Sequence, residues 1–309
     1  MIGTITLNPS IDQHILVRRL VKDDANRASS VSHYPGGKGA NVAKVVRELG
    51  GKTRAYALIG GFPGEFWKDL IKALTVPYTA EQIKGDTRIN TILTDLTDDS
   101  QTRISAPGPK VTEKELETFL RTLLSVRPRP AFWVLGGSLS LGMKNSTYRR
   151  FILALQKNGV PCVLDTDNEA LRSGIEAKPF LIKPNEYEME RLMERRLKSI
   201  SDYLGSARIL VRGGIRIVIV SLGGKGALFV TDKESFHVTT PHVLVKSKVG
   251  AGDSLIGGFL LGLARNLTLK EAARLGVAAS TSAVMREAPR LCLRRDIPGL
   301  IQRVAIRDL

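Results

Sequence analysis

The sequence predicts an α/β protein, a three-layer α/β/α sandwich with a mostly parallel central sheet and a small β-sheet lid. Three observations support this. From residue 113 to the end, short apolar runs alternate with helical patterns, as in right-handed β–α–β units. Several of these runs end in glycine-rich or polar segments, where parallel sheets place ligand-binding loops. The composition, 25% charged and 43% hydrophobic, is ordinary for a folded protein. The length of 309 residues allows one large α/β domain or two smaller ones, and we expect a single domain over residues 1–309.

The N-terminal region begins with an apolar strand over residues 1–7, followed by the turn Asn8-Pro9-Ser10-Ile11-Asp12. Asp12 closes this turn, at a place where α/β proteins often hold ligands. It can equally be an ordinary turn residue, because Asp is a common turn former. Residues 13–34 alternate loosely between apolar and polar, which predicts short strands outside the main sheet.

A glycine cluster, Pro35-Gly36-Gly37-Lys38-Gly39, precedes an amphipathic helix that ends near Gly50. The glycines permit close approach of the backbone to a ligand, and Lys38 and Asn41 add polar groups at the same end. A strand over 53–59 and a helix over 65–74 follow. Two further strands lie within 86–106 and are joined by the polar turn 97–100. Together with 13–34, they supply a lid that could cover a site.

The second half of the chain repeats the alternation of strand and helix. The helical patterns span 113–126, 146–158 and 186–193, and the strand patterns span 131–135, 160–164, 180–182 and 217–220. The strands are followed by Gly137-Ser138, by Asp165, by Lys183-Pro184-Asn185 and by Ser221-Leu222-Gly223. We therefore expect a ligand site along one edge of this sheet.

The stretch Val249-Gly250-Ala251-Gly252-Asp253-Ser254 opens an apolar helix and predicts an anion site. The first N–H groups of a helix have no partner within it, and the helix dipole adds positive charge there. Asp253 lies in the first turn, where a carboxylate can accept a proton from an attacking hydroxyl. The alternative is a plain N-terminal cap without chemistry.

Composition and motifs exclude several classes of protein. The two cysteines, Cys162 and Cys292, lie far apart and are expected to be reduced, and the four histidines lack metal-ligand spacing. The N-terminus lacks a signal-peptide pattern and no apolar run is long enough to span a membrane, so we expect a cytoplasmic protein. Neither a P-loop nor a dinucleotide GxGxxG pattern is complete. The net charge of +16 raises nucleic acid as a partner, but the basic residues are scattered along helical faces, so we expect none.

Four motifs together resemble those of the PfkB, or ribokinase-like, carbohydrate kinases, and the resemblance covers essentially the whole chain. Gly36-Gly37-Lys38-Gly39-Ala40-Asn41 resembles the first family signature and Val249 to Ser254 the second. Lys183-Pro184-Asn185-Glu186-Tyr187-Glu188 is similar to the NxxE element, and Ser221-Leu222-Gly223 to the nucleotide loop. The segments around Asp12, Arg88 and Ser138 resemble the branch whose substrates already carry a phosphate. That branch contains 1-phosphofructokinases, tagatose-6-phosphate kinases and the minor type of 6-phosphofructokinase.

The resemblance implies a ribokinase-like fold and a kinase that uses ATP and Mg²⁺ on a ketohexose phosphate, with fructose 6-phosphate preferred. Asp253 would be the general base, and Gly250, Ala251 and Gly252 the anion hole. The sugar phosphate would contact Asp12, Gly36, Gly37, Lys38, Asn41, Arg88, Asn90, Arg103, Ser138 and Arg27. ATP would contact Lys183, Asn185, Glu188, Ser221, Gly223 and Gly226, with hydrated Mg²⁺ near Glu188. A homodimer through the lid sheet is implied, in which Arg27 would reach the neighbouring site. A non-catalytic sensor and a basic nucleic-acid binder remain as alternatives of another class.

Two positions depart from the family pattern. Lys248 stands just before the second signature, where the family usually has a small hydroxyl residue. A lysine there could reach a nucleotide phosphate or could crowd the site. Ala25 stands where some 6-phosphofructokinases of this type carry a lysine for the substrate phosphate, which weakens the preference for fructose 6-phosphate.

Overall fold

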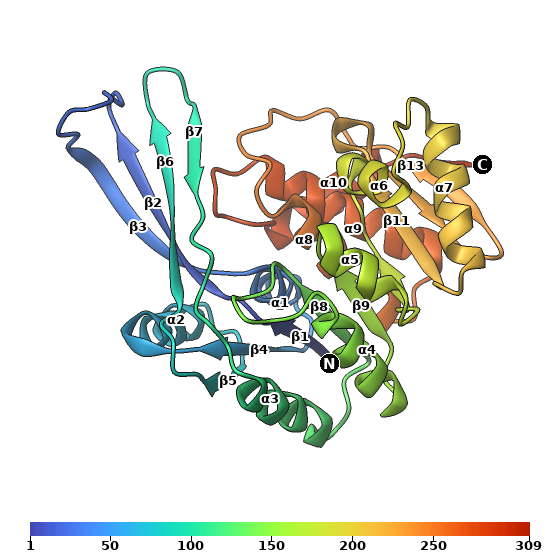
Figure 1. Ribbon diagram of the computed structural model, residues 1–309. Coiled ribbons are helices and arrows are strands. Elements are labelled where there is room, and N and C mark those ends of the chain that lie inside the picture. Colours follow the sequence, from blue (N-terminus) through green and yellow to red (C-terminus); the bar gives the residue numbers. More distant parts are fainter.

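The computed structural model describes residues 1–309 and confirms the α/β architecture (Figure 1). A ten-stranded sheet runs in the order β14-β13-β12-β11-β10-β9-β8-β1-β4-β5. Its parallel part consists of β1 (Ile2–Thr6), β4 (Thr53–Ile59), β5 (Tyr78–Gln82), β8 (Phe132–Gly136), β9 (Cys162–Asp165), β10 (Leu181–Ile182) and β11 (Ile217–Ser221). An antiparallel edge is added by β12 (Ala227–Val230), β13 (Ser235–Val238) and β14 (Ile306–Asp308).

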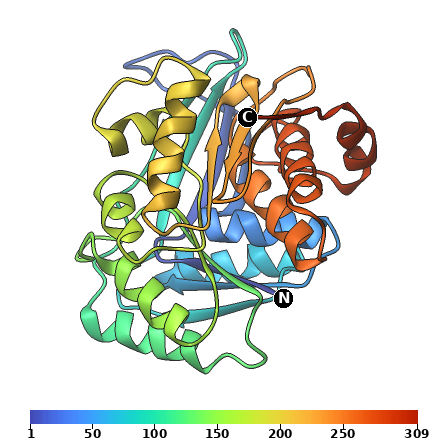
Figure 2. The ribbon, with the colours of Figure 1, turned by 90° about the vertical axis from the view of Figure 1, so that its right-hand side faces the viewer.

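Helices cover both faces of this sheet (Figure 2). One face carries α3 (Glu113–Ser125), α4 (Thr147–Lys157), α5 (Asn168–Ile175), α6 (Glu186–Met193) and α7 (Ile200–Arg212). The other carries α1 (Lys38–Glu48), α8 (Ala251–Ala264), α9 (Leu269–Val284) and α10 (Ile297–Arg303). Neighbouring residues of β8 divide between the two cores, Val134 in one and Leu135 in the other. This alternation explains why the central strands are apolar throughout.

The lid is a separate four-stranded sheet that projects from the main sheet (Figure 1). Its strands are β2 (Ser10–Val17), β3 (Ala28–Gly36), β6 (Arg88–Asp95) and β7 (Gln101–Ile104), in the order β3-β2-β6-β7. The placement of Asp12 in a turn is wrong, because β2 already begins at Ser10. Asp12 is instead a strand residue paired with Tyr34 on one side and Asn90 on the other.

The helix α2 (Gly61–Ala73) packs against the base of the lid, where Phe66 contacts His33 of β3. It begins four residues before the predicted start at Glu65. Pro63 lies in its first turn, where the missing N–H of proline costs no helical hydrogen bond.

None of the helices combines the length and the apolarity needed to cross a lipid bilayer.

Glycines let α8 lie close to its neighbours, and this fixes where its N-terminus points. A Cβ on Gly257 would lie 2.6 Å from Cγ1 of Val45 in α1. A Cβ on Gly258 would lie 2.9 Å from the carbonyl oxygen of Leu275 in α9. The backbone of α8 therefore sits against both helices, with its first turn at the carboxyl edge of the sheet.

Candidate active site

One large cavity of about 1030 Å³ lies between the lid and the carboxyl edge of the main sheet. Eighteen of the twenty predicted site residues line it: Asp12, Gly37, Lys38, Asn41, Arg88, Asn90, Arg103, Ser138, Lys183, Asn185, Glu188, Ser221, Gly223, Gly226, Gly250, Ala251, Gly252 and Asp253. The other two, Gly36 and Arg27, do not. Gly36 is buried at the end of β3, and Arg27 is exposed in the loop between β2 and β3.

The first turn of α8 forms a cradle of free backbone donors. Gly250 caps the helix in the left-handed conformation, with φ at 75°, which glycine adopts without strain. The N–H groups of Gly252 and Asp253 make no backbone hydrogen bond. A Cβ on Gly252 would lie 3.1 Å from the ammonium nitrogen of Lys183, so this cation borders the cradle. The cradle suits an anion.

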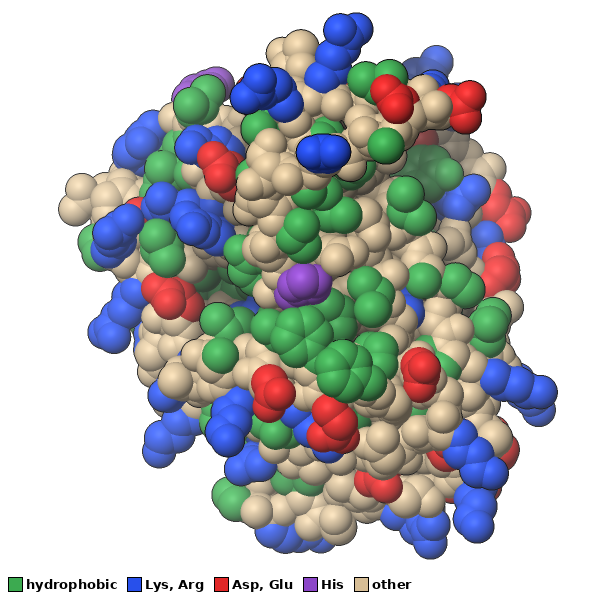
Figure 3. Space-filling view, turned by 90° about the vertical axis from the view of Figure 1, so that its left-hand side faces the viewer, with side chains coloured by type: hydrophobic (Ala, Val, Ile, Leu, Met, Phe, Trp, Pro, Cys, Tyr) green, Lys and Arg blue, Asp and Glu red, His purple; other side chains and the backbone are tan.

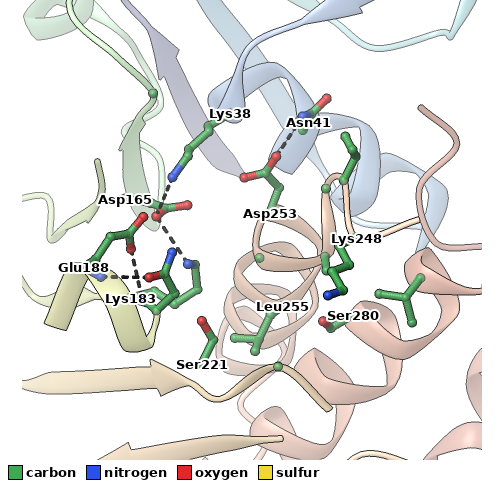
Figure 4. Close-up of a pocket in the computed structure, with 18 of the residues that line it drawn as sticks. Lys38, Asn41, Asp165, Lys183, Glu188, Ser221, Lys248, Asp253, Leu255 and Ser280 are labelled. Atoms are coloured by element: carbon green, nitrogen blue, oxygen red, sulfur yellow. Dashed lines mark hydrogen bonds and ion pairs between the residues drawn. The ribbon is translucent and has the colours of Figure 1, made fainter. Parts of the chain in front are cut away.

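Asp253 is buried at this cradle, with only 6% of its surface exposed. The amide of Asn41 in α1 donates to its Oδ2 at 2.7 Å and fixes the carboxylate, and Oδ1 is free of hydrogen bonds within the chain (Figure 4). Burial raises the pKa of Asp253 above its ordinary value, and the negative charge of Asp165 raises it further. The carboxylate lines the cavity, so it is accessible to a ligand.

A buried charge cluster lies beside Asp253 (Figure 4). The carboxylate of Asp165, at the end of β9, accepts from Lys38 at 3.0 Å and lies 3.4 Å from Lys183. Burial alone would raise the pKa of Asp165, but Lys183 and Lys38 outweigh it and lower this pKa. Burial also disfavours the charged form of Lys38, yet Asp165, Asp253 and Glu188 raise its pKa above the ordinary value. Lys38 is therefore held as a cation next to the cradle, and Lys183 lies against the same carboxylate.

The lid end of the cavity carries hydrogen-bonding groups. Asp12 accepts at Oδ1 from the hydroxyl of Ser10 at 2.8 Å and from the amide of Asn90 at 2.9 Å. Its Oδ2 has no hydrogen bond within the chain and lies against Gly36, where any Cβ would collide with it. Gly36 therefore supports the position of Asp12 from behind.

Arg88 provides a cation at the same end. Its guanidinium donates to the carbonyls of Ala106 at 2.7 Å and Asn8 at 3.1 Å, and it lies near the Ser138 hydroxyl. It has no carboxylate partner, and its buried Nε has no acceptor. Burial lowers the pKa of Arg88 from its ordinary value. A cation with spare donors in a cavity is suited to an anionic ligand.

The opposite end of the cavity is formed by the loops after β10 and β11. Asn185 and Glu188 form the capping box of α6: each backbone N–H donates to the other's side chain, at 2.9 and 2.8 Å. Both residues therefore stabilise the N-terminus of α6, and both also line the cavity. No group of three or more His, Cys, Asp and Glu side chains is arranged to hold a metal ion directly.

Several lining residues were not predicted from the sequence. Asp165 is one, and a larger group comes from residues 240–245 and from α9: Thr240, Pro241, His242, Val243, Val245, Val277, Ser280, Thr281 and Val284. A strand ending in Asp165 gave the only local signal. Ser280, Thr281 and Val284 belong to an ordinary amphipathic stretch of α9, so no motif in the sequence marks them.

Comparison with known proteins gives a consistent result. A family model described as "pfkB family carbohydrate kinase" matches residues 2–295. The chain is 34% identical over 287 residues to the 1-phosphofructokinase of Bacillus subtilis, covering 93% of each. It is also 34% identical over 297 residues to the ATP-dependent 6-phosphofructokinase isozyme 2 of Escherichia coli, covering 96% of each. The crystal structure of Escherichia coli phosphofructokinase-2 in complex with fructose-6-phosphate matches with a TM-score of 0.92, at 33% identity, covering 97% of this chain and 98% of that one.

Proposed function

Because the chain belongs to the pfkB family of carbohydrate kinases, we propose that it transfers the γ-phosphoryl group of ATP to a fructose phosphate. The preferred acceptor in this proposal is fructose 6-phosphate, and the product is fructose 1,6-bisphosphate. Fructose 1-phosphate is the second candidate, since a 1-phosphofructokinase and a 6-phosphofructokinase are equally identical to this chain. Tagatose 6-phosphate is a further acceptor of the same class.

The observation that carries this proposal is the position of Asp253. A fixed carboxylate with one free oxygen borders both the cradle of α8 and the cavity that leads to Arg88. A base, an anion cradle and a hydrogen-bonding pocket in one cavity are the parts that phosphoryl transfer to a hydroxyl requires.

In the proposed reaction, Oδ1 of Asp253 accepts the proton of the sugar hydroxyl as its oxygen attacks the γ-phosphorus. The new O–P bond forms while the bond to the oxygen of ADP breaks, and ADP leaves. The N–H groups of the α8 cradle, with Lys183 at its border, stabilise the charge on the transferring group. Asp12 and Asn90 bind sugar hydroxyls, and Arg88 pairs with the phosphate that the sugar already carries.

Mg²⁺ belongs to this proposal as the partner of the nucleotide phosphates, whose charge it would offset. The residues present fit a hydrated ion, because Oδ2 of Asp165 is buried without a partner and Glu188 faces the same cavity. Mg²⁺ keeps most of its waters and needs few protein ligands. Asp165 and Glu188 would hold it through these waters.

A lid-to-lid homodimer is also part of the proposal. Exposed apolar side chains on one face of the lid sheet support it: Val31 is 48% exposed, Ile89 48% and Ile104 63%. The strand register places these three on the face opposite Asp12 and Asn90. Figure 3 shows hydrophobic side chains gathered on the side of the molecule that carries the lid. In such a dimer the exposed Arg27 would reach the site of the partner subunit.

We place the reaction in the cytoplasm, where ATP and sugar phosphates occur.

The test is an assay of ADP release with fructose 6-phosphate, fructose 1-phosphate and tagatose 6-phosphate as separate acceptors. We expect turnover with at least one of them, dependent on Mg²⁺, and none with unphosphorylated fructose at the same concentration. Absence of ADP release with all three contradicts the proposal. A salt-sensitive gel shift without ADP release would favour a nucleic-acid binder instead.

A further inference from the structure

Lys248 lies at the entrance to the α8 cradle. It lines the cavity, and its carbonyl is 3.5 Å from the N–H of Ala251, the first residue of α8. Figure 4 shows its side chain beside the first turn of α8, directed toward Ser280 of α9 and away from Asn41. It therefore lies on the side of the cavity formed by α9 and the 240–245 loop, opposite the lid.

The backbone on both sides of Lys248 is fixed. The N–H groups of Lys246 and Ser247 both donate to the carbonyl of Val284, at 2.8 and 3.3 Å. The buried hydroxyl of Ser247 accepts from the N–H of Val249 at 3.2 Å. These contacts fix residues 246–249 against the end of α9, so the Cα of Lys248 has a defined position at the wall of the cavity.

Lys248 differs from Lys38, Lys183 and Arg88, the other cations of the cavity described above, in its lack of protein partners. Lys38 and Lys183 share the carboxylate of Asp165, and Arg88 is bonded to two backbone carbonyls. Lys248 makes neither an ion pair nor a side-chain hydrogen bond, and it is exposed to the cavity. Its three ammonium donors are free for a ligand.

A nucleotide bound between the cradle and α9 would bring its phosphates into this region. The triphosphate carries several negative charges. Lys183 shares the carboxylate of Asp165 with Lys38, and two further carboxylates, Glu186 and Glu188, line the same end of the cavity. Mg²⁺ would offset part of the triphosphate charge, and at this end of the cavity Lys248 is the cation without a protein partner, so its ammonium can pair with the phosphate charge that remains. We propose that Lys248 binds a non-transferred phosphate of the nucleotide and sets the affinity for ATP and ADP. This inference rests on the proposed kinase function.

The test compares Lys248→Met with Lys246→Met. Lys246 is a matched control, because it lies two residues away, is 48% exposed, pairs with Glu287 at 3.6 Å and does not line the cavity. Calorimetry with ADP and with adenosine as probes measures binding without turnover. We expect Lys248→Met to weaken ADP roughly tenfold or more, as loss of a hydrogen bond to a charged group does. Adenosine binding should be unchanged, and Lys246→Met should bind ADP like the parent.

Kinetics supply a second readout. Lys248→Met should raise the KM for ATP and leave the KM for the sugar phosphate unchanged. An ADP affinity within twofold of the parent overturns the inference. An equal loss for adenosine also overturns it, since the contact would then be to the ribose or the base. Lys248→Thr, which restores the small hydroxyl of the family, provides a second variant if the methionine variant fails to fold.

The inference and the proposed function fail in different ways. If the parent releases no ADP with any sugar phosphate, the kinase proposal fails, whereas the ADP titration still tests Lys248. If the parent turns over and Lys248→Met binds ADP normally, only the role of Lys248 is wrong.

Discussion

Among single residues, Asp253 is the one whose substitution should lower the catalytic rate most. General bases contribute about 10²- to 10⁴-fold to a rate. Asp253→Asn should therefore lower kcat by about that factor while keeping the hydrogen bond to Asn41 and the KM values. Initial rates of ADP release, alongside sugar-phosphate titration of the variant, provide the measurement. Near-parental turnover would remove Asp253 from the role of base.

The same substitution should stabilise the fold. The raised pKa of Asp253 means that its ionised form is disfavoured in the folded state relative to the unfolded chain. At neutral pH this costs stability, and the cost disappears as pH falls below the ordinary aspartate range. Asparagine carries no charge, so thermal unfolding of Asp253→Asn at pH 7 should show a Tm above that of the parent.

The pH profile gives a second prediction for this residue. The base must be deprotonated, so kcat/KM should fall as pH is lowered through the raised pKa of Asp253, above the usual aspartate range. Asp165→Asn removes the neighbouring negative charge and leaves Lys38 and Lys183 to act on Asp253. The acid limb of this variant should move to lower pH. If the acid limb of the pH profile stays at the same pH in this variant, Asp165 does not influence the pKa of Asp253.

Arg88 should govern recognition of the acceptor phosphate. A charge-assisted hydrogen bond is worth about 1.5–3 kcal/mol, or roughly 10- to 100-fold in affinity. Arg88→Ala should raise the KM for the sugar phosphate by about that factor and leave the KM for ATP unchanged. Arg149→Ala is the control, because Arg149 forms a surface ion pair with Glu176 and does not line the cavity. Equal effects on phosphorylated and unphosphorylated sugar would exclude the phosphate contact.

Local motifs in the sequence identify some of these residues and not others. Asp253 and its glycines are neighbours in the chain, so one stretch predicts both the base and the cradle. The role of Asp165 depends on Lys38 from α1 and Lys183 from the end of β10, which meet it only in the folded chain. No short stretch of the sequence shows that these three residues meet.

At the scale of elements, the packing of α8 leads to a prediction about stability. Gly258→Val would place atoms against Leu275 and Gly276 of α9, and overpacking typically costs about 1–3 kcal/mol. Gly205→Ala in α7 is the matched control, because its Cβ would meet nothing within 4 Å. It should stabilise the protein by about 0.5–1 kcal/mol. Chemical denaturation of both variants provides the comparison, and a neutral Gly258→Val would contradict the close packing.

Helices and strands with a clear hydrophobic periodicity could be predicted from the sequence. Short strands that form only by pairing with distant segments could not. The pattern over 186–193 matches α6 to the residue, and the lid hairpin follows from its polar turn. The patterns do not identify β5 or the antiparallel edge of β12 to β14. These strands are short, and their pairing depends on segments such as the C-terminal residues 306–308, which meet β13 only in the folded chain.

At the scale of the whole molecule, the lid surface predicts the oligomeric state. Ile104→Asp would place a charge in the proposed lid interface and should shift the dimer to monomer in light scattering or sedimentation. Ile209→Asp is the control, since Ile209 is 55% exposed on α7, away from the lid. A parent that is monomeric at micromolar concentration would contradict the lid dimer.

The lid and the body divide the cavity between them. Asp12, Arg88, Asn90 and Arg103 belong to lid strands, whereas Asp253, Lys183 and the α8 cradle belong to the body. In the proposed reaction the lid residues would bind the acceptor and the body would bind the donor, so the attacking oxygen would reach the phosphorus only when both parts are correctly placed. In the proposed reaction a water molecule would have no lid contacts to place it against the phosphorus, so this division would limit hydrolysis of ATP in the absence of a sugar.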